Sequence, residues 1–118
     1  MKNKKKVLVT GSAGFLGSHL VDALLKKNLH VIGIDNFIGG YKDNVSKRSE
    51  FHNMDCCDLQ KLNSIMSGVE VVYHCAATAH EGLSVFSPYE ITKNNYLASV
   101  AVFTAAIKKN LKRIIFCS

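Results

Sequence analysis

Short hydrophobic runs rich in β-branched residues alternate with longer segments of helical period along the chain. The hydrophobic runs predict five strands, of which the third is the weakest, at residues 6–10, 30–34, 50–54, 69–75 and 113–116. This alternation is typical of βαβ units and of a parallel sheet. Right-handed crossovers then predict an α/β fold with a doubly wound parallel sheet in the strand order 3-2-1-4-5.

The helical segments carry start and stop signals. Asn28 is a plausible end for the first helix, and Asp58 is a good N-cap for a short helix over residues 59–66. Pro88 suits the first turn of a long helix that runs to about residue 109, in which we expect residues 98–107 to form a core face. The first helix carries apolar residues on one side, and the second carries four residues at helical spacing. They are Phe15, Leu16, Leu20, Val21, Leu24 and Leu25 in the first, and Val100, Phe103, Thr104 and Ile107 in the second.

Composition and charge narrow the class of protein. Of the 118 residues, 47% are hydrophobic and 20% are charged, which favours one globular domain over a disordered chain. No apolar run approaches the roughly 20 residues that a bilayer requires. The net charge of +6 owes much to Lys2, Lys4, Lys5 and Lys6, and the other charges are scattered. We therefore expect neither a nucleic acid nor a membrane as a partner.

The cysteines favour a reducing compartment. Cys56, Cys57, Cys75 and Cys117 have neither CxxC spacing nor the density of a disulfide-stabilised secreted fold. The apolar run at residues 7–9 is too short for the h-region of a signal peptide. We therefore expect a cytoplasmic protein whose thiols are reduced and serve in packing. The histidines lack metal-binding spacing, so we expect no metal site, and we expect His74 to pack near the carboxyl edge of the sheet.

A glycine-rich turn lies between the first predicted strand and the first predicted helix, where a phosphate-binding loop would have to lie. Gly11 allows the tight turn, Gly14 allows the close approach of a pyrophosphate, and Gly17 lets the helix pack on the strand. The free N–H groups at the start of the helix would then face an anion. The absence of a GxxxxGK[ST] motif from the sequence disfavours a P-loop nucleotide triphosphatase.

An acidic residue, Asp35, closes the second predicted strand. A carboxylate there can accept both hydroxyls of an adenosine ribose, and it would repel a 2′-phosphate. No arginine adjoins Asp35 to accommodate that phosphate. The sequence therefore favours NAD over NADP as the cofactor, and the alternative is a solvated aspartate that begins a loop.

With the TGxxGxxG spacing of its glycine loop, the chain resembles the extended short-chain dehydrogenase/reductase family, in particular its NAD-dependent nucleotide-sugar epimerases and dehydratases. This resemblance implies an NAD(P)-binding Rossmann domain. Residues 35–37, with Gly39, Gly40 and Asn44 after them, resemble the ribose-contacting loop of the family, and residues 74–77 resemble its HxAA segment. Asp58 and Leu59 match the adenine-contacting pair of the family, and Asn95 matches a helix asparagine that supports the active site. The cofactor-binding residues implied by the resemblance are Gly11, Gly14, Phe15, Leu16, Gly17, Asp35, Asn36, Asp58, Leu59, Cys75, Ala76, Ala77, Asn95 and Ser118.

The family's catalytic groups are a Ser or Thr hydroxyl, a Tyr that acts as general base, and a Lys four residues after that Tyr. The resemblance places Ser118 just before the hydroxyl and the other two groups beyond it. We therefore expect no catalytic residue in these 118 residues and no activity of the chain alone. Tyr89 and Lys93 also have YxxxK spacing, but they precede the fifth strand, whereas the family's pair follows it. We expect them to lie on a solvated helix face.

The fifth predicted strand has no covering helix after it, so we expect residues 1–118 to be the incomplete, N-terminal cofactor part of a longer protein. Its apolar flank at residues 114–116 should be exposed and favour aggregation. The complete protein is expected to act on a nucleotide sugar, with a UDP-sugar 4-epimerase as the best match, and possible homodimerisation is part of that expectation. Ala79 replaces a cofactor-contacting lysine of some sugar epimerases, which leaves the subfamily open. The alternatives are a non-catalytic NAD(P)-binding regulator and an extended-family reductase acting on another carbonyl substrate.

Overall fold

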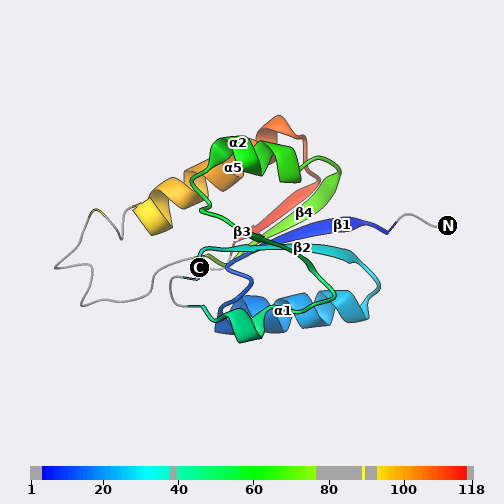
Figure 1. The fold of residues 1–118 in the computed structure, drawn as a ribbon. Helices are drawn as coiled ribbons and strands as arrows, with labels where there is room; N and C mark the ends of the chain where they lie inside the picture. Colours follow the sequence, from blue (N-terminus) through cyan, green and yellow to red (C-terminus); the bar gives the residue numbers. More distant parts are fainter. Residues whose placement is uncertain (1–3, 38–39, 77–88, 90–92, 117–118) are drawn as a thin grey trace.

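The structure, a computed structural model, describes residues 4–37, 40–76, 89 and 93–116. The described residues form a parallel five-stranded sheet in the order β3-β2-β1-β4-β5 (Figure 1). Helix α1 lies on one face of this sheet, and helices α2 and α5 lie on the other. The predicted fold class and strand order are therefore confirmed.

All five predicted strands are present, and their ends differ from the prediction by at most one residue. β4 ends one residue earlier than predicted, at the point where the Cys75 N–H group donates to the side-chain hydroxyl of Thr10 in β1. The strands are β1 (Lys6–Thr10), β2 (His30–Asp35), β3 (Glu50–Asn53), β4 (Val69–His74) and β5 (Arg113–Phe116).

The core consists of two layers, one on each side of β1. Val7 and Val9 point toward α1 (Phe15–Lys26), and Leu8 points toward α2 (Leu59–Ile65) and α5 (Ala98–Lys108). Alternate side chains of a strand face opposite sides of a sheet, which explains why β1 is buried on both. Each fully buried Val or Leu stabilises the fold by about 1.5–3 kcal/mol. The central strand β1 therefore holds its carboxyl end firmly in the sheet.

Helix α1 is confirmed, but not all of its apolar residues are buried. Val21 and Leu24 are buried, whereas Phe15 is 82% exposed and Leu16 is 55% exposed. Phe15 and Leu16 fall outside the arc of the helix that faces the sheet, so they do not belong to the core. The predicted stop is confirmed, because Asn28 adopts the left-handed conformation with φ 62°.

Helix α5 buries a different face from the one predicted. Its buried residues are small or β-branched: Ala98, Val102, Ala105 and Ala106. Val100 and Thr104 are exposed, as is Ile107, so the predicted core face at these positions is wrong. The alanines allow α5 to lie close to the sheet and to α2. The larger side chains of α5 at positions 100 and 107 therefore face outward. The predicted start of this helix at Pro88 falls outside the described residues.

The fifth strand lies at the edge of the described sheet. Ile115 is 37% exposed and Phe116 is 54% exposed, because among the described strands β5 pairs only with β4. The predicted exposure of this apolar flank is confirmed at Ile115 and Phe116, whereas Ile114 is partly buried against the core. Aggregation stays a prediction. None of the described helices has the length and apolar character needed to cross a bilayer.

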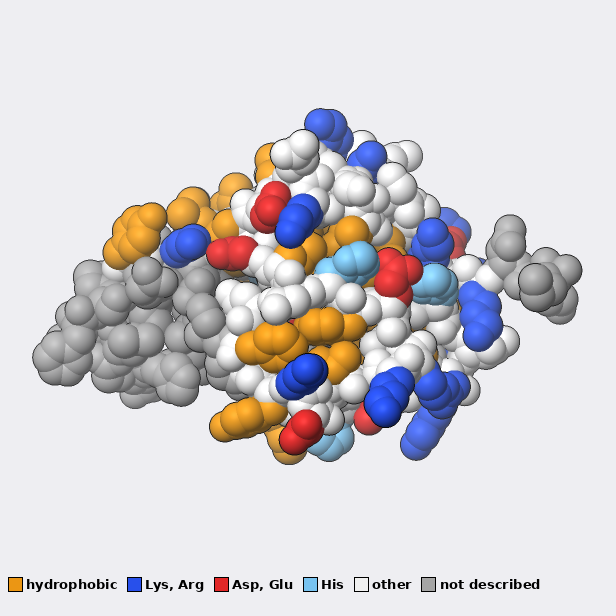
Figure 2. Space-filling model, viewed as in Figure 1, with side chains coloured by type: hydrophobic (Ala, Val, Ile, Leu, Met, Phe, Trp, Pro, Cys, Tyr) orange, Lys and Arg blue, Asp and Glu red, His pale blue; other side chains and the backbone are white. Residues whose placement is uncertain are grey.

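The distribution of charge agrees with the sequence pattern. Figure 2 shows Lys and Arg side chains gathered toward the end of the molecule from which the N-terminus emerges. The same face shows hydrophobic side chains at the opposite end, over the start of the segment that leads into α5. On this face, the basic side chains are therefore not concentrated at the carboxyl edge of the sheet.

Candidate functional site

The candidate site lies at the carboxyl edge of the sheet. β1 ends at Thr10, β2 at Asp35 and β4 at His74, and these strands are neighbours in the order β2-β1-β4. The chain leaves β1 for β2 on one side and reaches β4 on the other, so the end of β1 is the topological switch point. In open α/β sheets, ligands bind at this point.

The glycine loop after β1 is packed too tightly for side chains at two positions. Gly11 has φ 69°, and a Cβ atom there would lie 2.9 Å from the backbone nitrogen of Ala76. A Cβ atom on Gly17 would lie 2.0 Å from the carbonyl oxygen of Gly11. The tight turn predicted at Gly11 is confirmed. Gly17 was predicted to let the helix pack on the strand, but its close contacts are with Gly11 and Ser12, so it packs α1 against the turn.

The start of α1 is available to an anion. Its N-cap is Gly14, which has no side chain to accept from the first N–H groups, and its first turn holds no acidic residue. By contrast, α2 is capped by Asp58, whose carboxylate accepts from the Lys61 N–H group at 3.2 Å. The N–H groups and dipole of an uncapped helix start favour a phosphate or another anion. The helix start is therefore compatible with a pyrophosphate beside Gly14, and this role stays a prediction.

Asp35 lies beside this loop in a fixed orientation. It is 7% exposed, and its Oδ2 atom accepts from the Ala13 N–H group at 2.9 Å. Its Oδ1 atom accepts from the Phe37 N–H group at 2.7 Å. A carboxylate has about four acceptor positions, so two are left for hydroxyl groups of a ligand. The structure therefore fits the predicted role of Asp35 toward a ribose, which stays a prediction.

The segment around the 3-10 helix η1 (Lys42–Asn44) secures the glycine loop from the other side. The Ala13 carbonyl accepts from the Asn44 side-chain amide at 2.9 Å and from the Tyr41 N–H group at 3.1 Å. A Cβ atom on Gly40 would lie 3.0 Å from the Ala13 carbonyl group. Gly40 and Asn44, which resemble part of a ribose loop, therefore also hold the glycine loop in place.

One packing contact beneath the loop was missed from the sequence. Gly33 lies inside β2, and a Cβ atom there would lie 2.6 Å from the Ser12 Oγ atom. A glycine within a strand often marks such a close approach, so this signal could have been used. Ser12 and Gly33 together allow the glycine loop to lie directly on β2.

The end of β4 is attached to the end of β1 through side chains. The Thr10 hydroxyl oxygen accepts from the N–H groups of Cys75 at 2.9 Å and of Ala76 at 3.0 Å. His74 is 1% exposed, and its ring packs against the rings of Phe103 and Phe116, which also pack against each other. Its predicted packing near the carboxyl edge is confirmed.

The remaining predicted residues are less closely joined to the loop. Among the described contacts, none connects Asp58 or Leu59 with the glycine loop, and Leu59 is 39% exposed. Asn36 is exposed directly after β2, and Asn95 is half-buried in the π-helical turn η2 (Lys93–Leu97). Ala77 and Ser118 lie outside the described residues.

The described cysteines form no disulfide and agree with a packing role. Cys56 is buried, and burial, with the nearby Asp55 carboxylate, raises the pKa of its thiol to about 12. Burial and Asp55 also raise the pKa of the Cys57 thiol. Both thiols are therefore protonated near neutral pH, which makes them poor nucleophiles. Cys117 lies outside the described residues.

The YxxxK pair does not form a joint site. Tyr89 is 71% exposed, and the Lys93 Nζ atom lies 3.5 Å from a carboxylate oxygen of Asp55. Burial raises the pKa of Asp55, but hydrogen bonds from Cys57 and the Lys93 charge outweigh it, so that pKa is lowered overall. Lys93 therefore neutralises Asp55 and is not directed to Tyr89 for catalysis.

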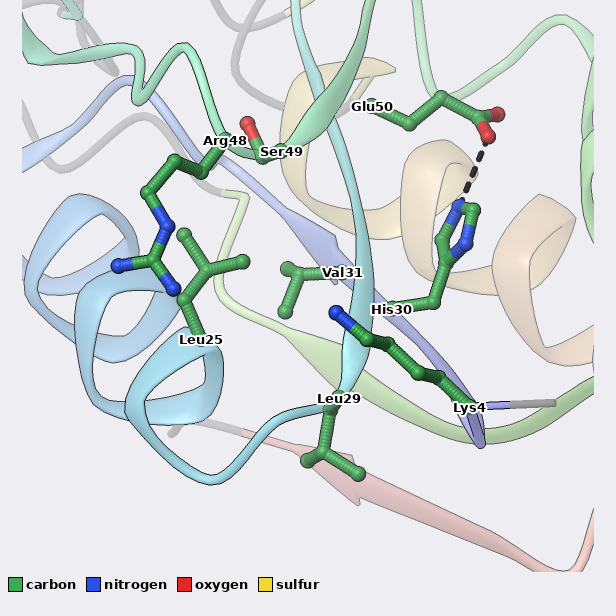
Figure 3. A pocket seen from close by; sticks show the side chains of 8 residues that line it. All are labelled: Lys4, Leu25, Leu29, His30, Val31, Arg48, Ser49 and Glu50. Carbon is green, nitrogen blue, oxygen red and sulfur yellow. Dashed lines mark hydrogen bonds and ion pairs between the residues drawn. The ribbon is translucent and has the colours of Figure 1, made fainter. Parts of the chain in front are cut away.

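A cavity of about 290 Å³ lies at the opposite, amino-terminal edge of the sheet (Figure 3). Its cations, Lys4 and Arg48, are exposed, and its carboxylate, Glu50, accepts from His30 at 2.9 Å and from His52 at 2.8 Å. Ligand pockets hold convergent polar groups that are preorganised and enclosed. This cavity lacks them among its described residues, so we assign it no chemistry.

We expect the stability of the fold to depend on pH through His74. Burial lowers the pKa of its ring to about 4, against 6.5 for an unfolded chain. Between these values the unfolded chain binds a proton that the folded chain does not, so the free energy of unfolding falls as pH falls from 6.5 to 4. The expected loss is on the order of 3 kcal/mol over this range. Urea unfolding from pH 4.5 to pH 7 should show a steeper pH dependence for the wild type than for His74→Gln, and equal slopes would contradict this account.

Comparisons with known proteins point to one family. The sequence model of the NAD dependent epimerase/dehydratase family matches residues 7–118. UDP-glucose 4-epimerase of Halalkalibacterium halodurans is 34% identical over 95% of this chain and 34% of its own. UDP-glucuronic acid decarboxylase 4 of Arabidopsis thaliana is 36% identical over 80% of this chain and 21% of its own. The crystal structure of Thermus thermophilus UDP-glucose 4-epimerase in complex with NAD has a TM-score of 0.88 and 32% identity, covering 96% of this chain and 37% of that one.

Proposed function

The chain belongs to the NAD-dependent epimerase/dehydratase family, and we propose on this basis that its carboxyl-edge site binds the NAD of a nucleotide-sugar epimerase. The chain spans 34% of the length of the Halalkalibacterium halodurans relative and 21% of the Arabidopsis thaliana relative. The activity and the substrate of the whole protein are therefore part of the proposal.

The observation that carries the proposal is the pairing of an uncapped helix start with a fixed carboxylate. The first N–H groups of α1 face the edge without a capping side chain, and Asp35 is held beside them by its bond from Ala13. A dinucleotide carries a pyrophosphate and a ribose diol close together, which match a helix start and a carboxylate respectively. This arrangement supports NAD over NADP, because a 2′-phosphate would meet the negative charge of Asp35.

Bound NAD would supply reversible hydride transfer at a sugar carbon. The residues of this chain bind and orient the cofactor. The N–H groups at the start of α1 hold the pyrophosphate, and Asp35 holds the adenosine ribose. Cys75 and Ala76 follow β4, where small residues let the cofactor lie against the backbone. We propose no catalytic role for Tyr89 and Lys93, and we propose that the chain alone does not turn over substrate.

The identity of the reaction is the finer part of the proposal. A UDP-sugar 4-epimerase is favoured by the Halalkalibacterium halodurans relative. A nucleotide-sugar decarboxylase is a second candidate, favoured by the Arabidopsis thaliana relative. Both would use the same cofactor half. A non-catalytic NAD(P)-binding regulator, a reductase on another carbonyl substrate and homodimerisation of the complete protein stay predictions from the sequence.

Calorimetric titration of the chain with NAD and with NADP tests the cofactor proposal. We expect saturable binding of one NAD per chain, and weaker binding of NADP because its 2′-phosphate is repelled by Asp35. Circular dichroism of the same sample establishes that the chain is folded. A folded chain that binds neither dinucleotide, or prefers NADP, would contradict the proposal.

A further inference from the structure

A buried chain of hydrogen bonds runs from β1 through β4 to α5. The Thr10 Oγ1 atom lies 2.7 Å from the His74 Nδ1 atom, and the His74 Nε2 atom lies 2.9 Å from the Ser99 Oγ atom. The Ser99 hydroxyl in turn donates to the Asn95 carbonyl at 2.8 Å. Ser99 belongs to none of the sequence motifs, and the three side chains come from segments far apart in the sequence.

The direction of every bond in this chain follows from the valence of Thr10. A hydroxyl has one donor and two acceptor positions, and the Thr10 oxygen already accepts from the N–H groups of Cys75 and Ala76. Its own proton must therefore go to His74 Nδ1, which leaves the ring proton on Nε2. That proton is donated to Ser99, which passes its own to the Asn95 carbonyl. The three hydrogen bonds therefore all run in one direction, from the Thr10 hydroxyl to the Asn95 carbonyl.

The same argument excludes a charged imidazole. A second ring proton on Nδ1 would face a Thr10 oxygen that has no acceptor position left. The rings of Phe103 and Phe116, with centroids 6.0 Å and 5.7 Å from that of His74, cover the imidazole. The lowered pKa of His74 agrees with this geometry.

The chain of bonds connects two parts of the candidate site. At one end are the N–H groups of Cys75 and Ala76, directly after β4. At the other end is Asn95, which lies in a π-helical turn. A π-helical turn is less regular than an α-helix and occurs frequently at functional sites, so its position depends on contacts from outside the helix.

We propose that Ser99 and His74 are positioning residues of the dinucleotide site: their directional bonds fix η2, and with it Asn95, relative to the end of β4. This inference rests on the proposed function, because it assumes that Asn95 and residues 75–76 serve a cofactor. Loss of the Ser99 hydroxyl then releases η2 without removing any group expected to touch the cofactor.

The test compares Ser99→Ala with a matched control on the same helix. Thr104 also donates its hydroxyl to a carbonyl four residues earlier, that of Val100 at 2.7 Å, but it is exposed and outside the chain of bonds. We expect Ser99→Ala to weaken NAD binding about threefold to tenfold. We expect Thr104→Ala to leave binding unchanged and Ser99→Thr, which keeps the hydroxyl, to restore it. Equal NAD affinity of Ser99→Ala and the wild type would overturn the proposal.

Nuclear magnetic resonance of the ligand-free chain separates this proposal from the proposed function. The ring nitrogen shifts of His74 should show a neutral ring with its proton on Nε2. Ser99→Ala should move the amide signals of Cys75, Ala76 and Asn95, whereas Thr104→Ala should not. A proton on Nδ1, or unmoved amide signals, would overturn the positioning role even if NAD binds. If the expected shifts are seen but the wild type binds no NAD, the proposed function fails, and the cofactor part of this inference fails with it.

Discussion

Replacing Gly17 by alanine is expected to unfold much of the chain, although alanine normally favours a helix. In a helix interior the change from Gly to Ala stabilises by about 1 kcal/mol. Here the new Cβ atom would lie 2.0 Å from the Gly11 carbonyl oxygen, and neither backbone segment can yield alone. Gly11 is confined by Ala76 on its other side. We expect the free energy of unfolding to fall by about 3 kcal/mol or more, measured by urea denaturation.

Gly14→Ala is the matched control for this substitution. Gly14 has φ −83°, which any residue adopts, and a Cβ atom there would lie 3.3 Å from the same carbonyl oxygen. We expect this variant to fold with a much smaller loss of stability. Its methyl group would occupy the space next to the helix start, so NAD binding should weaken. If Gly17→Ala were as stable as the wild type, the tight packing of α1 on the glycine turn would be wrong.

Replacing Asp35 by asparagine is expected to change the preference between the two dinucleotides. Hydrogen bonds to a charged group are worth about 1.5–3 kcal/mol, so NAD binding should weaken roughly tenfold to a hundredfold. NADP binding should weaken less or improve, because the charge that repels its 2′-phosphate is removed. The affinity for NAD divided by the affinity for NADP should therefore fall, as measured by calorimetry on folded protein.

This ratio separates recognition from stability. Asparagine keeps one acceptor oxygen, so one of the bonds from Ala13 and Phe37 is lost and some stability with it. A general distortion of the glycine loop would weaken both dinucleotides alike. Asp22→Asn, on the exposed side of α1, makes the same change of net charge away from the site and should leave both affinities unchanged. Equal weakening of NAD and NADP by Asp35→Asn would contradict direct recognition of the ribose.

Features written in short stretches of sequence could be predicted. The strands were found because their hydrophobic runs are short and β-branched, and the N-cap at Asp58 was found because it bonds only three residues away. The turn at Gly11 was also found from a short stretch of sequence, the glycine motif at residues 11–17. The predicted packing of His74 near the carboxyl edge followed from its place at the end of a predicted strand.

Features that depend on distant partners could not be predicted. Helix α5 is apolar on more than one side, and only the packing of its alanines on the sheet and α2 decides that Val102 is buried and Ile107 is not. The strand character of β5 is local, whereas its burial depends on what lies beside it. The partners of His74 are separated from it by 64 and 25 positions, and no local pattern indicates either of them.

The bonds that hold the glycine loop also fix when the site can form during folding. Ala13 is bound to Asp35 and Asn44, which lie 22 and 31 positions away, and Thr10 is bound to His74 across 64 positions. Closing such loops costs entropy that is recovered only once the strands have paired. We therefore expect the candidate site to be completed late in folding, after β1 has paired with β2 and β4.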